Sequence, residues 1–89
     1  MGIVLMNEKQ VAKKFGILPM KVGMDVDTIR MYKPWFAFER GRLKFSDVEV
    51  EAYRIYRDTY ERTRDHRFAI TDLIEYLERH RMAEFLVDF

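Results

Sequence analysis

Residues 36–49 read FAFERGRLKFSDVE and join a β-hairpin pattern to the start of a helix. Arg40 and Gly41 form a two-residue turn in the simplest register, although a loop of three or four residues fits the pattern as well. In the two-residue register, apolar side chains that face each other across the strands share one face. These pairs are Phe38 with Leu43 and Phe36 with Phe45, and on the other face Glu39 lies opposite Arg42 and Ala37 opposite Lys44.

The hairpin is followed by a capping-box pattern at Ser46 and Glu49, which predicts the start of a long helix. The inward positions of that helix follow helical spacing from Val48. They are Ala52, Ile55, Tyr56 and Thr59. We expect a last helix to begin after Thr71, with inward positions at Leu73, Ile74 and Leu77.

Upstream of the hairpin, Asn7 can cap a short helix, and Gln10 completes a capping box with it. Gly16 is a typical stop for this helix. Residues 17–24 are predicted to form a long turn, because Pro19 disfavours a continuing helix.

A second helix is predicted to start near Asp25 or Asp27, since either side chain can cap it. Pro34 disfavours helical geometry at Lys33, so this helix should end about there. The predicted fold is therefore mainly α, with about four helices and one two-stranded β-hairpin.

The chain has 89 residues and a hydrophobic share of 48%, which predicts a single folded domain over residues 1–89. It contains no cysteine, so disulfides and zinc–thiolate sites are excluded, and a reducing, cytoplasmic compartment is expected. The apolar start at residues 1–6 is too short for a signal peptide or a membrane span. We therefore expect a cytoplasmic protein that does not bind a membrane.

The net charge of +1 conceals an uneven distribution of charge along the chain. Residues 1–67 carry a balance of +4, and residues 68–89 a balance of −3. Between Arg30 and Lys44, five basic residues accompany a single acidic one, Glu39. Such a segment attracts polyanions, although a solvated charged face on an ordinary domain has the same composition.

The residues needed for common catalytic and metal sites are missing or unsuitably spaced. Ser46 is the only serine and already caps a helix, which argues against a serine hydrolase. The spacing of His66 and His80 does not place two metal ligands on one helical face. The four glycines are dispersed, which argues against a phosphate-binding loop. We expect no catalysis, no cofactor, no metal and no small-molecule effector.

Residues 23–33, GMDVDTIRMYK, resemble the second-helix region of MerR-type winged helix-turn-helix proteins. Residues 42–48 are similar to the wing strand of that family where it enters the third helix, and residues 66–74 resemble the start of the fourth. The segment 10–17 resembles the first helix and turn but lies seven residues too far from the second-helix motif. Met31 replaces the first of two aromatic residues in the family pattern.

The resemblance implies a winged helix-turn-helix fold and non-catalytic binding of double-stranded DNA, in which a helix enters the major groove and the hairpin contacts phosphates. Short proteins of this type include phage and mobile-element excisionases, small subunits of DNA-packaging terminases, small chromosome-binding modules and transcription regulators. An architectural or recruiting role is therefore implied. No long dimerisation helix is expected after residue 80, so the drug and metal sensing of larger relatives does not carry over.

The same resemblance implies three groups of DNA-binding residues. Residues of the second helix and the segment after it would contact the groove or its phosphates. These are Thr28, Arg30, Tyr32 and Lys33. The wing would contribute Arg40, Arg42 and Lys44, and the first helix Lys13 and Lys14.

These assignments have alternatives that do not involve DNA. Arg30 can pair on the helix surface with Asp27 or Glu39, and Lys13 and Lys14 can belong to a solvated face. Tyr32 can pack in the core under the wing, and core packing is the favoured interpretation for Trp35.

A protein-interaction module is the main alternative function, as an adaptor or inhibitor that docks through the aromatic hairpin and the apolar C-terminus. RNA binding is a third, without a recognisable single-strand motif. Residues 83–89 are expected to form an association tail for a homodimer or a partner protein, unless they fold back onto their own core. The large apolar residues of this tail are Phe85, Leu86, Val87 and Phe89.

Overall fold

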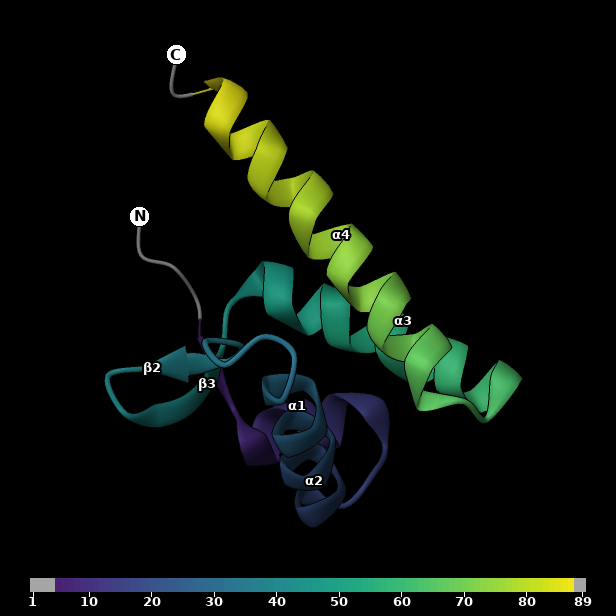
Figure 1. Cartoon of the computed structure of the whole chain (residues 1–89). Helices are drawn as coiled ribbons and strands as arrows, with labels where there is room; N and C mark the ends of the chain where they lie inside the picture. The colour runs from purple at the N-terminus through teal and green to yellow at the C-terminus, as the bar shows by residue number, and fades with distance from the viewer. Residues whose placement is uncertain (1–4, 88–89) are drawn as a thin grey trace. The chain divides into compact units, whose positions relative to one another are not determined.

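The structure, a computed structural model, describes residues 5–87 of the chain, and the side chains of residues 5–80. Four helices and three short strands follow one another in the order β1, α1, α2, β2, β3, α3, α4 (Figure 1). Contacts divide the chain into two compact units, of which unit 1 ends at Val50 and unit 2 begins at Glu51. No described helix combines the length and the apolar character needed to cross a membrane.

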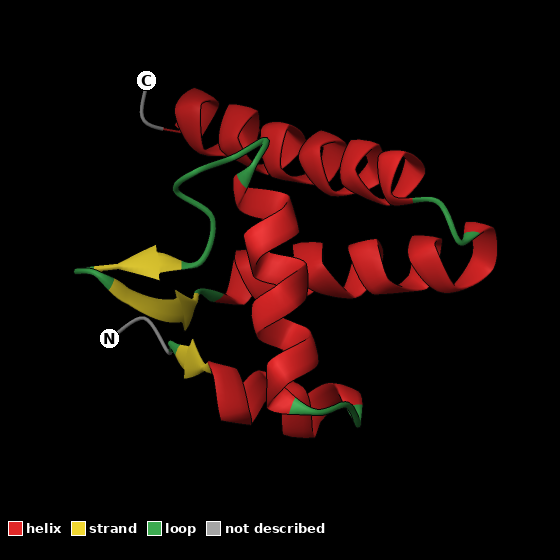
Figure 2. Cartoon of the chain, turned by 60° about the horizontal axis from the view of Figure 1, so that its bottom comes forward, coloured by secondary structure: helices red, strands yellow, loops and turns green. Residues whose placement is uncertain are grey.

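The sheet of unit 1 has three antiparallel strands in the order β1-β3-β2 (Figure 2). The strands are β1 (Met6–Asn7), β2 (Phe38–Glu39) and β3 (Arg42–Phe45). The prediction of a two-stranded hairpin was therefore wrong, because Met6 pairs with Phe45 and Asn7 with Lys44. A strand of two residues is too short to show the alternation that identifies a strand in a sequence.

The predicted two-residue turn between the hairpin strands is confirmed. Phe38 lies opposite Leu43 and Glu39 opposite Arg42, so Arg40 and Gly41 connect the strands. Both turn residues adopt a left-handed conformation, with φ of 50° at Arg40 and 80° at Gly41. Hairpin turns of two residues with positive φ at both positions match the right-handed twist of the strands.

The predicted pairing of Phe36 with Phe45 was wrong, since β2 begins only at Phe38 and the strand partner of Phe45 is Met6. Ala37 has φ of 52°, and this left-handed residue interrupts the alternation of side chains before β2 begins. The two phenylalanine rings still meet edge to face in the core, with centroids 5.7 Å apart. Phe38, by contrast, is 55% exposed, so the four apolar side chains do not share one buried face.

Helix α1 (Glu8–Phe15) has the boundaries that its caps predict. The side chain of Asn7 accepts a hydrogen bond of 2.8 Å from the backbone N–H of Gln10, and the Gln10 side chain accepts one of 2.9 Å from the backbone N–H of Asn7. Gly16 ends the helix with φ of 67°. The capping box is thus confirmed.

Helix α2 (Pro19–Arg30) contradicts the prediction of a long turn at residues 17–24. Pro19 stands in the first turn, where its missing N–H costs nothing and its fixed φ already suits a helix. The buried residues of α2 follow helical spacing on both sides of residue 24, where the predicted turn was to end. They are Val22, Asp25, Val26 and Ile29.

Helix α3 (Asp47–Thr63) starts at the predicted capping box. The backbone N–H of Glu49 donates to Ser46 Oγ over 3.3 Å, and the backbone N–H of Ser46 donates to Glu49 Oε1 over 2.9 Å. Of the predicted inward positions, Ala52, Tyr56 and Thr59 are buried and Ile55 is half-buried.

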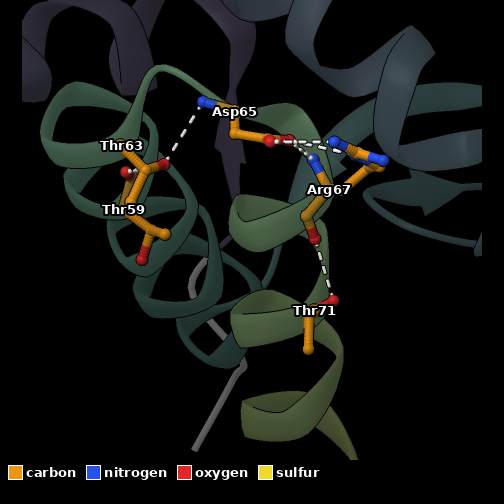
Figure 3. Close-up of polar contacts among 5 residues, drawn as sticks. All are labelled: Thr59, Thr63, Asp65, Arg67 and Thr71. Atoms are coloured by element: carbon orange, nitrogen blue, oxygen red, sulfur yellow. Dashed lines mark hydrogen bonds and ion pairs between the residues drawn. The ribbon is translucent and has the colours of Figure 1, made fainter.

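Helix α4 (His66–Val87) begins earlier than the predicted start after Thr71, which was therefore wrong. The carboxylate of Asp65 caps it by accepting a 2.8 Å hydrogen bond from the backbone N–H of Arg67 (Figure 3). Thr71 lies inside the helix, where its hydroxyl donates to the Arg67 carbonyl. Within unit 2, the Thr59 hydroxyl donates to Asp72 Oδ2 over 2.7 Å and links α3 to α4.

Two of the three predicted inward positions of α4, Leu73 and Leu77, are buried, and Ile74 is half-buried. Residues 83–87 of the predicted association tail are the last residues of this helix, and residues 88–89 lie outside the described residues. The side chains of Phe85, Leu86 and Val87, and the whole of Phe89, lie outside the described residues.

The cap at Asp65 predicts a pH-dependent contribution to stability. The hydrogen bond from the Arg67 side chain lowers the pKa of Asp65 below its ordinary value, and the backbone N–H of Arg67 adds to the effect. Because the folded-state pKa is the lower one, the contribution is present above the unfolded pKa of about 4 and is lost as the pH falls through the folded value. Asp65→Ala should therefore melt below the wild type at pH 7, and the difference should shrink at pH 3.

Circular dichroism melting curves at the two pH values measure this effect. Asp65→Asn separates the cap from the charge: its side-chain oxygen can still cap the helix, so at pH 7 it should melt above Asp65→Ala but below the wild type. An equal difference between Asp65→Ala and wild type at both pH values would mean that the carboxylate charge plays no part.

Candidate nucleic-acid interface

All nine predicted DNA-binding residues lie in unit 1. They occupy the last turn of α1, the end of α2, the segment after it, and the hairpin. In chain order they are Lys13, Lys14, Thr28, Arg30, Tyr32, Lys33, Arg40, Arg42 and Lys44. Unit 1 also carries the positive balance of charge, because the first 50 residues contain nine basic and six acidic residues.

The hairpin presents Arg40 and Arg42 as exposed cations at its tip, and Lys44 is half-buried further along β3. The tip projects away from α1 and α2 in both views of the fold (Figures 1 and 2). None of these three side chains makes an ion pair or a hydrogen bond among the residues that the structure describes. A hairpin of this kind can bring two or three positive charges to a surface without steric interference from α1 and α2.

The exposed Lys13 and Lys14 lie in the last turn of α1, which contacts both α2 and β3. Lys44 pairs with Asn7 at the opposite end of that helix. At 1.5 Å per residue, these two places are about 10 Å apart along the helix axis, which is close to the roughly 12 Å width of the DNA major groove. Neither Lys13 nor Lys14 has an acidic partner within residues 5–80.

Among the described arginines of unit 2, all but the exposed Arg62 are arranged differently, because ion pairs within or next to their own helices compensate their charge. Five arginines pair with carboxylates two to four residues away. They are Arg54, Arg57, Arg64, Arg67 and Arg79. In unit 1, Lys21 makes such a pair with the buried carboxylate of Asp25. Among the described residues, the cations without an acidic partner therefore concentrate on α1 and the hairpin.

Arg30 is bound to the backbone of its own chain. Its Nε donates to the Phe36 carbonyl over 2.8 Å and its Nη2 to the Ala37 carbonyl over 2.9 Å. The guanidinium carbon also lies 5.5 Å from the centroid of the Phe38 ring. The acceptors are therefore main-chain oxygens six and seven residues away, which no charge pattern in the sequence indicates.

The same loop is held from its other side by α3. The backbone N–H of Ala37 donates to Glu49 Oε2 over 2.8 Å, while Oε1 of the same carboxylate completes the capping box. Arg30 and Glu49 thus bind successive polar groups of one short segment. This arrangement fixes the left-handed conformation of Ala37 and the point at which β2 begins.

The outward face of α2 is apolar and acidic, although this helix was predicted to face the DNA groove. Exposed residues follow one another at spacings of four, three and four positions, which places them on one stripe. They are Met20, Met24, Asp27 and Met31. Thr28 is half-buried and donates to the Met24 carbonyl over 3.2 Å. The sequence contains this methionine spacing, but the prediction of a long turn at residues 17–24 obscured it.

Trp35 is 47% exposed, so the prediction that it packs in the core was wrong. The neighbouring Phe36 occupies the core instead and is fully buried. Trp35 stands in a tight turn closed by a 3.0 Å hydrogen bond from the Phe36 N–H to the Lys33 carbonyl. The Lys33 ammonium lies 6.0 Å from the centroid of the Trp35 ring, and Tyr32 beside it is also exposed.

Among the described side chains, no group of three histidine, cysteine, aspartate or glutamate residues gathers as metal ligands would. Comparisons with protein-family models, with characterised proteins and with solved structures find no match to this chain. The function is therefore inferred from the charges and contacts of the described residues.

The contacts of Arg30 predict a large effect on stability. Arg30→Ala leaves the carbonyls of Phe36 and Ala37 without their donor, and hydrogen bonds to charged groups contribute roughly 1.5–3 kcal/mol each. Both bonds are only part-buried, so water can replace some of this loss, and we expect the free energy of unfolding, measured by urea denaturation, to fall by about 2–4 kcal/mol.

Arg30→Lys should restore little of this loss, because an ammonium group cannot offer two donors in the fixed fork of a guanidinium. Arg40→Ala, at the exposed hairpin tip, is the control and should change the free energy of unfolding by less than about 0.5 kcal/mol. If Arg30→Ala unfolds at the wild-type urea concentration, these hydrogen bonds do not stabilise the loop.

Proposed function

We propose that unit 1 binds double-stranded DNA without catalysing a reaction on it. The observation that carries this proposal is the concentration of unpaired cations on α1 and the hairpin, among the described residues, in contrast to the paired arginines of unit 2. Lysine and arginine side chains that neutralise phosphates release condensed counterions, and this release drives binding. Cations already paired with carboxylates would gain less from the same contacts.

The hairpin acts as the wing in this proposal. Arg40 and Arg42 at its projecting tip contact phosphates, and Lys44 lies closer to α1. Two helices, a sheet and a third helix follow one another in the order that the resemblance to MerR-type proteins implies. We extend the proposal to that arrangement and describe unit 1 as a winged helix-turn-helix in which β1 adds a third strand.

Binding through these contacts depends on phosphates more than on bases. The outward stripe of α2 offers methionines and Asp27, whereas the bidentate contacts that distinguish guanine and adenine come from arginine, lysine, asparagine and glutamine. Arg30 already donates two hydrogen bonds to its own backbone. The proposal is therefore an architectural or recruiting protein with weak sequence preference.

Salt dependence tests the proposal. Affinity for a random duplex should fall by about one to three decades between roughly 50 and 200 mM salt, as about three to five phosphate contacts predict. The variant Arg40→Gln, Arg42→Gln, Lys44→Gln should bind every duplex more weakly and lower the salt slope by about 0.9 for each phosphate that is no longer neutralised.

The matched control removes three exposed, paired arginines of unit 2: Arg54→Gln, Arg64→Gln, Arg79→Gln. It changes the net charge by the same amount and should leave the slope near that of the wild type. Equal slopes for the wild type and the hairpin variant would remove the hairpin from the interface. Absence of duplex binding even at low salt would contradict the proposed function itself.

The methionine stripe of α2 favours a second function, a protein-interaction module. Exposed methionines adapt to varied apolar partners, and the stripe has the heptad-like spacing of a helix that packs against another helix. A second copy of the chain could bind there, as could a partner protein. Under this function, sedimentation should show concentration-dependent association that Met24→Lys removes without lowering the melting temperature. A wild type that stays monomeric at all concentrations would contradict self-association.

A further inference from the structure

The turn at residues 33–36 presents the only tryptophan of the chain to solvent. Pro34 precedes Trp35 at the tip of this turn and restricts the backbone there. Phe36 follows it and is fully buried, so the chain is anchored in the core one residue beyond the exposed ring. Trp35 is therefore held at a defined position while its side chain remains accessible.

Two charged side chains, one from α2 and one from α3, bind the backbone at the end of this turn. Arg30 holds the carbonyls of Phe36 and Ala37, and Glu49 accepts a hydrogen bond from the Ala37 N–H. Ligand contacts by a residue held in this way cost less conformational entropy than contacts by a mobile one. The loop has the properties of a preorganised contact point.

Other exposed aromatic residues lie close to Trp35 in the sequence, and this distinguishes it from an isolated tryptophan on a surface. Tyr32 and Phe38, three residues before and after Trp35, are more than half exposed, and Trp35 itself is 47% exposed. In unit 2, the described exposed aromatic residue of comparable size is Phe68. One short segment of unit 1 thus exposes three aromatic side chains, each of which can bury a large apolar area against a partner.

Positive charge beside the rings restricts the kind of partner. The Lys33 ammonium lies 6.0 Å from the Trp35 centroid, and the Arg30 guanidinium lies 5.5 Å from the Phe38 centroid. These charges repel a cationic partner and favour one that combines a flat π-system with negative charge. A nucleobase attached to its phosphate has this combination, and its face is accessible when the base is outside the duplex stack.

We propose that Trp35 stacks on an unpaired nucleobase, while Lys33 binds the phosphate next to that base. The inference rests on the proposed function, since unit 1 brings the nucleic acid to this surface. It adds a preference for DNA that contains an extrahelical or single-stranded base. The hairpin cations then supply general affinity, and Trp35 distinguishes the distorted site from a regular duplex.

The test uses three probes: a duplex with one extrahelical thymidine, the same duplex without it, and heparin as a polyanion without bases. Because Trp35 is the only tryptophan, its fluorescence reports on this position alone. We expect quenching with the extrahelical thymidine, little change with the regular duplex or heparin, and affinity about 5- to 100-fold higher for the distorted duplex.

Trp35→Ala should bind the two duplexes equally, and Trp35→Phe should keep part of the preference because phenylalanine can still stack. Phe68→Ala is the matched control, since Phe68 is also an exposed aromatic residue, 60% accessible, and lies in unit 2. It should keep the full preference. Wild-type preference in Trp35→Ala, or unchanged fluorescence at saturation, would overturn the proposal.

The two proposals can fail separately in this experiment. If the wild type binds both duplexes equally and the hairpin variant binds neither, the base-stacking inference is wrong and the proposed function stands. If the protein binds a single-stranded oligothymidylate with quenching but no regular duplex, the duplex-binding function is wrong and base stacking stands. Quenching by self-association alone, without nucleic acid, would assign Trp35 to a protein interface and overturn the inference.

Discussion

The fork of hydrogen bonds from Arg30 to the carbonyls of Phe36 and Ala37 is the contact on which the arrangement of unit 1 depends. It joins the end of α2 to the segment that leads into the sheet, and Glu49 at the start of α3 holds the same segment through an N–H group. With the backbone fixed in this way, Phe36 enters the core and its neighbour Trp35 remains outside. A structural arginine thus determines which aromatic side chain is available to a ligand.

The two units differ less in their number of charged residues than in how many of their described basic side chains have an acidic partner. Five of the six described arginines of unit 2 pair with carboxylates two to four residues away, so much of their field is cancelled locally. The cations of α1 and the hairpin have no such partner within the described residues and remain available to an external anion. Net charge alone, at +1, conceals this difference. Affinity for a polyanion is therefore expected to arise in unit 1, with the aromatic loop adding selectivity for exposed bases.

Predictions from the sequence succeeded where a signal and its structural partner lie within three or four residues. The capping boxes at Asn7 and Ser46 and the turn at Arg40 are of this kind. Predictions failed where the same residue type is compatible with two different local structures. Pro19 was interpreted as a helix breaker but starts α2, because a proline in the first turn lacks only an N–H that would have no partner there.

The sequence by itself determined the helix caps and the hairpin turn, because these depend on neighbouring residues along the chain. Tertiary structure decided the third strand, in which Met6 pairs with Phe45, and the acceptors of Arg30. It also decided that Phe36 is buried in the core and that the neighbouring Trp35 stays exposed. Such outcomes depend on contacts between distant residues and on the space available in the core, and no local pattern in a single sequence encodes either.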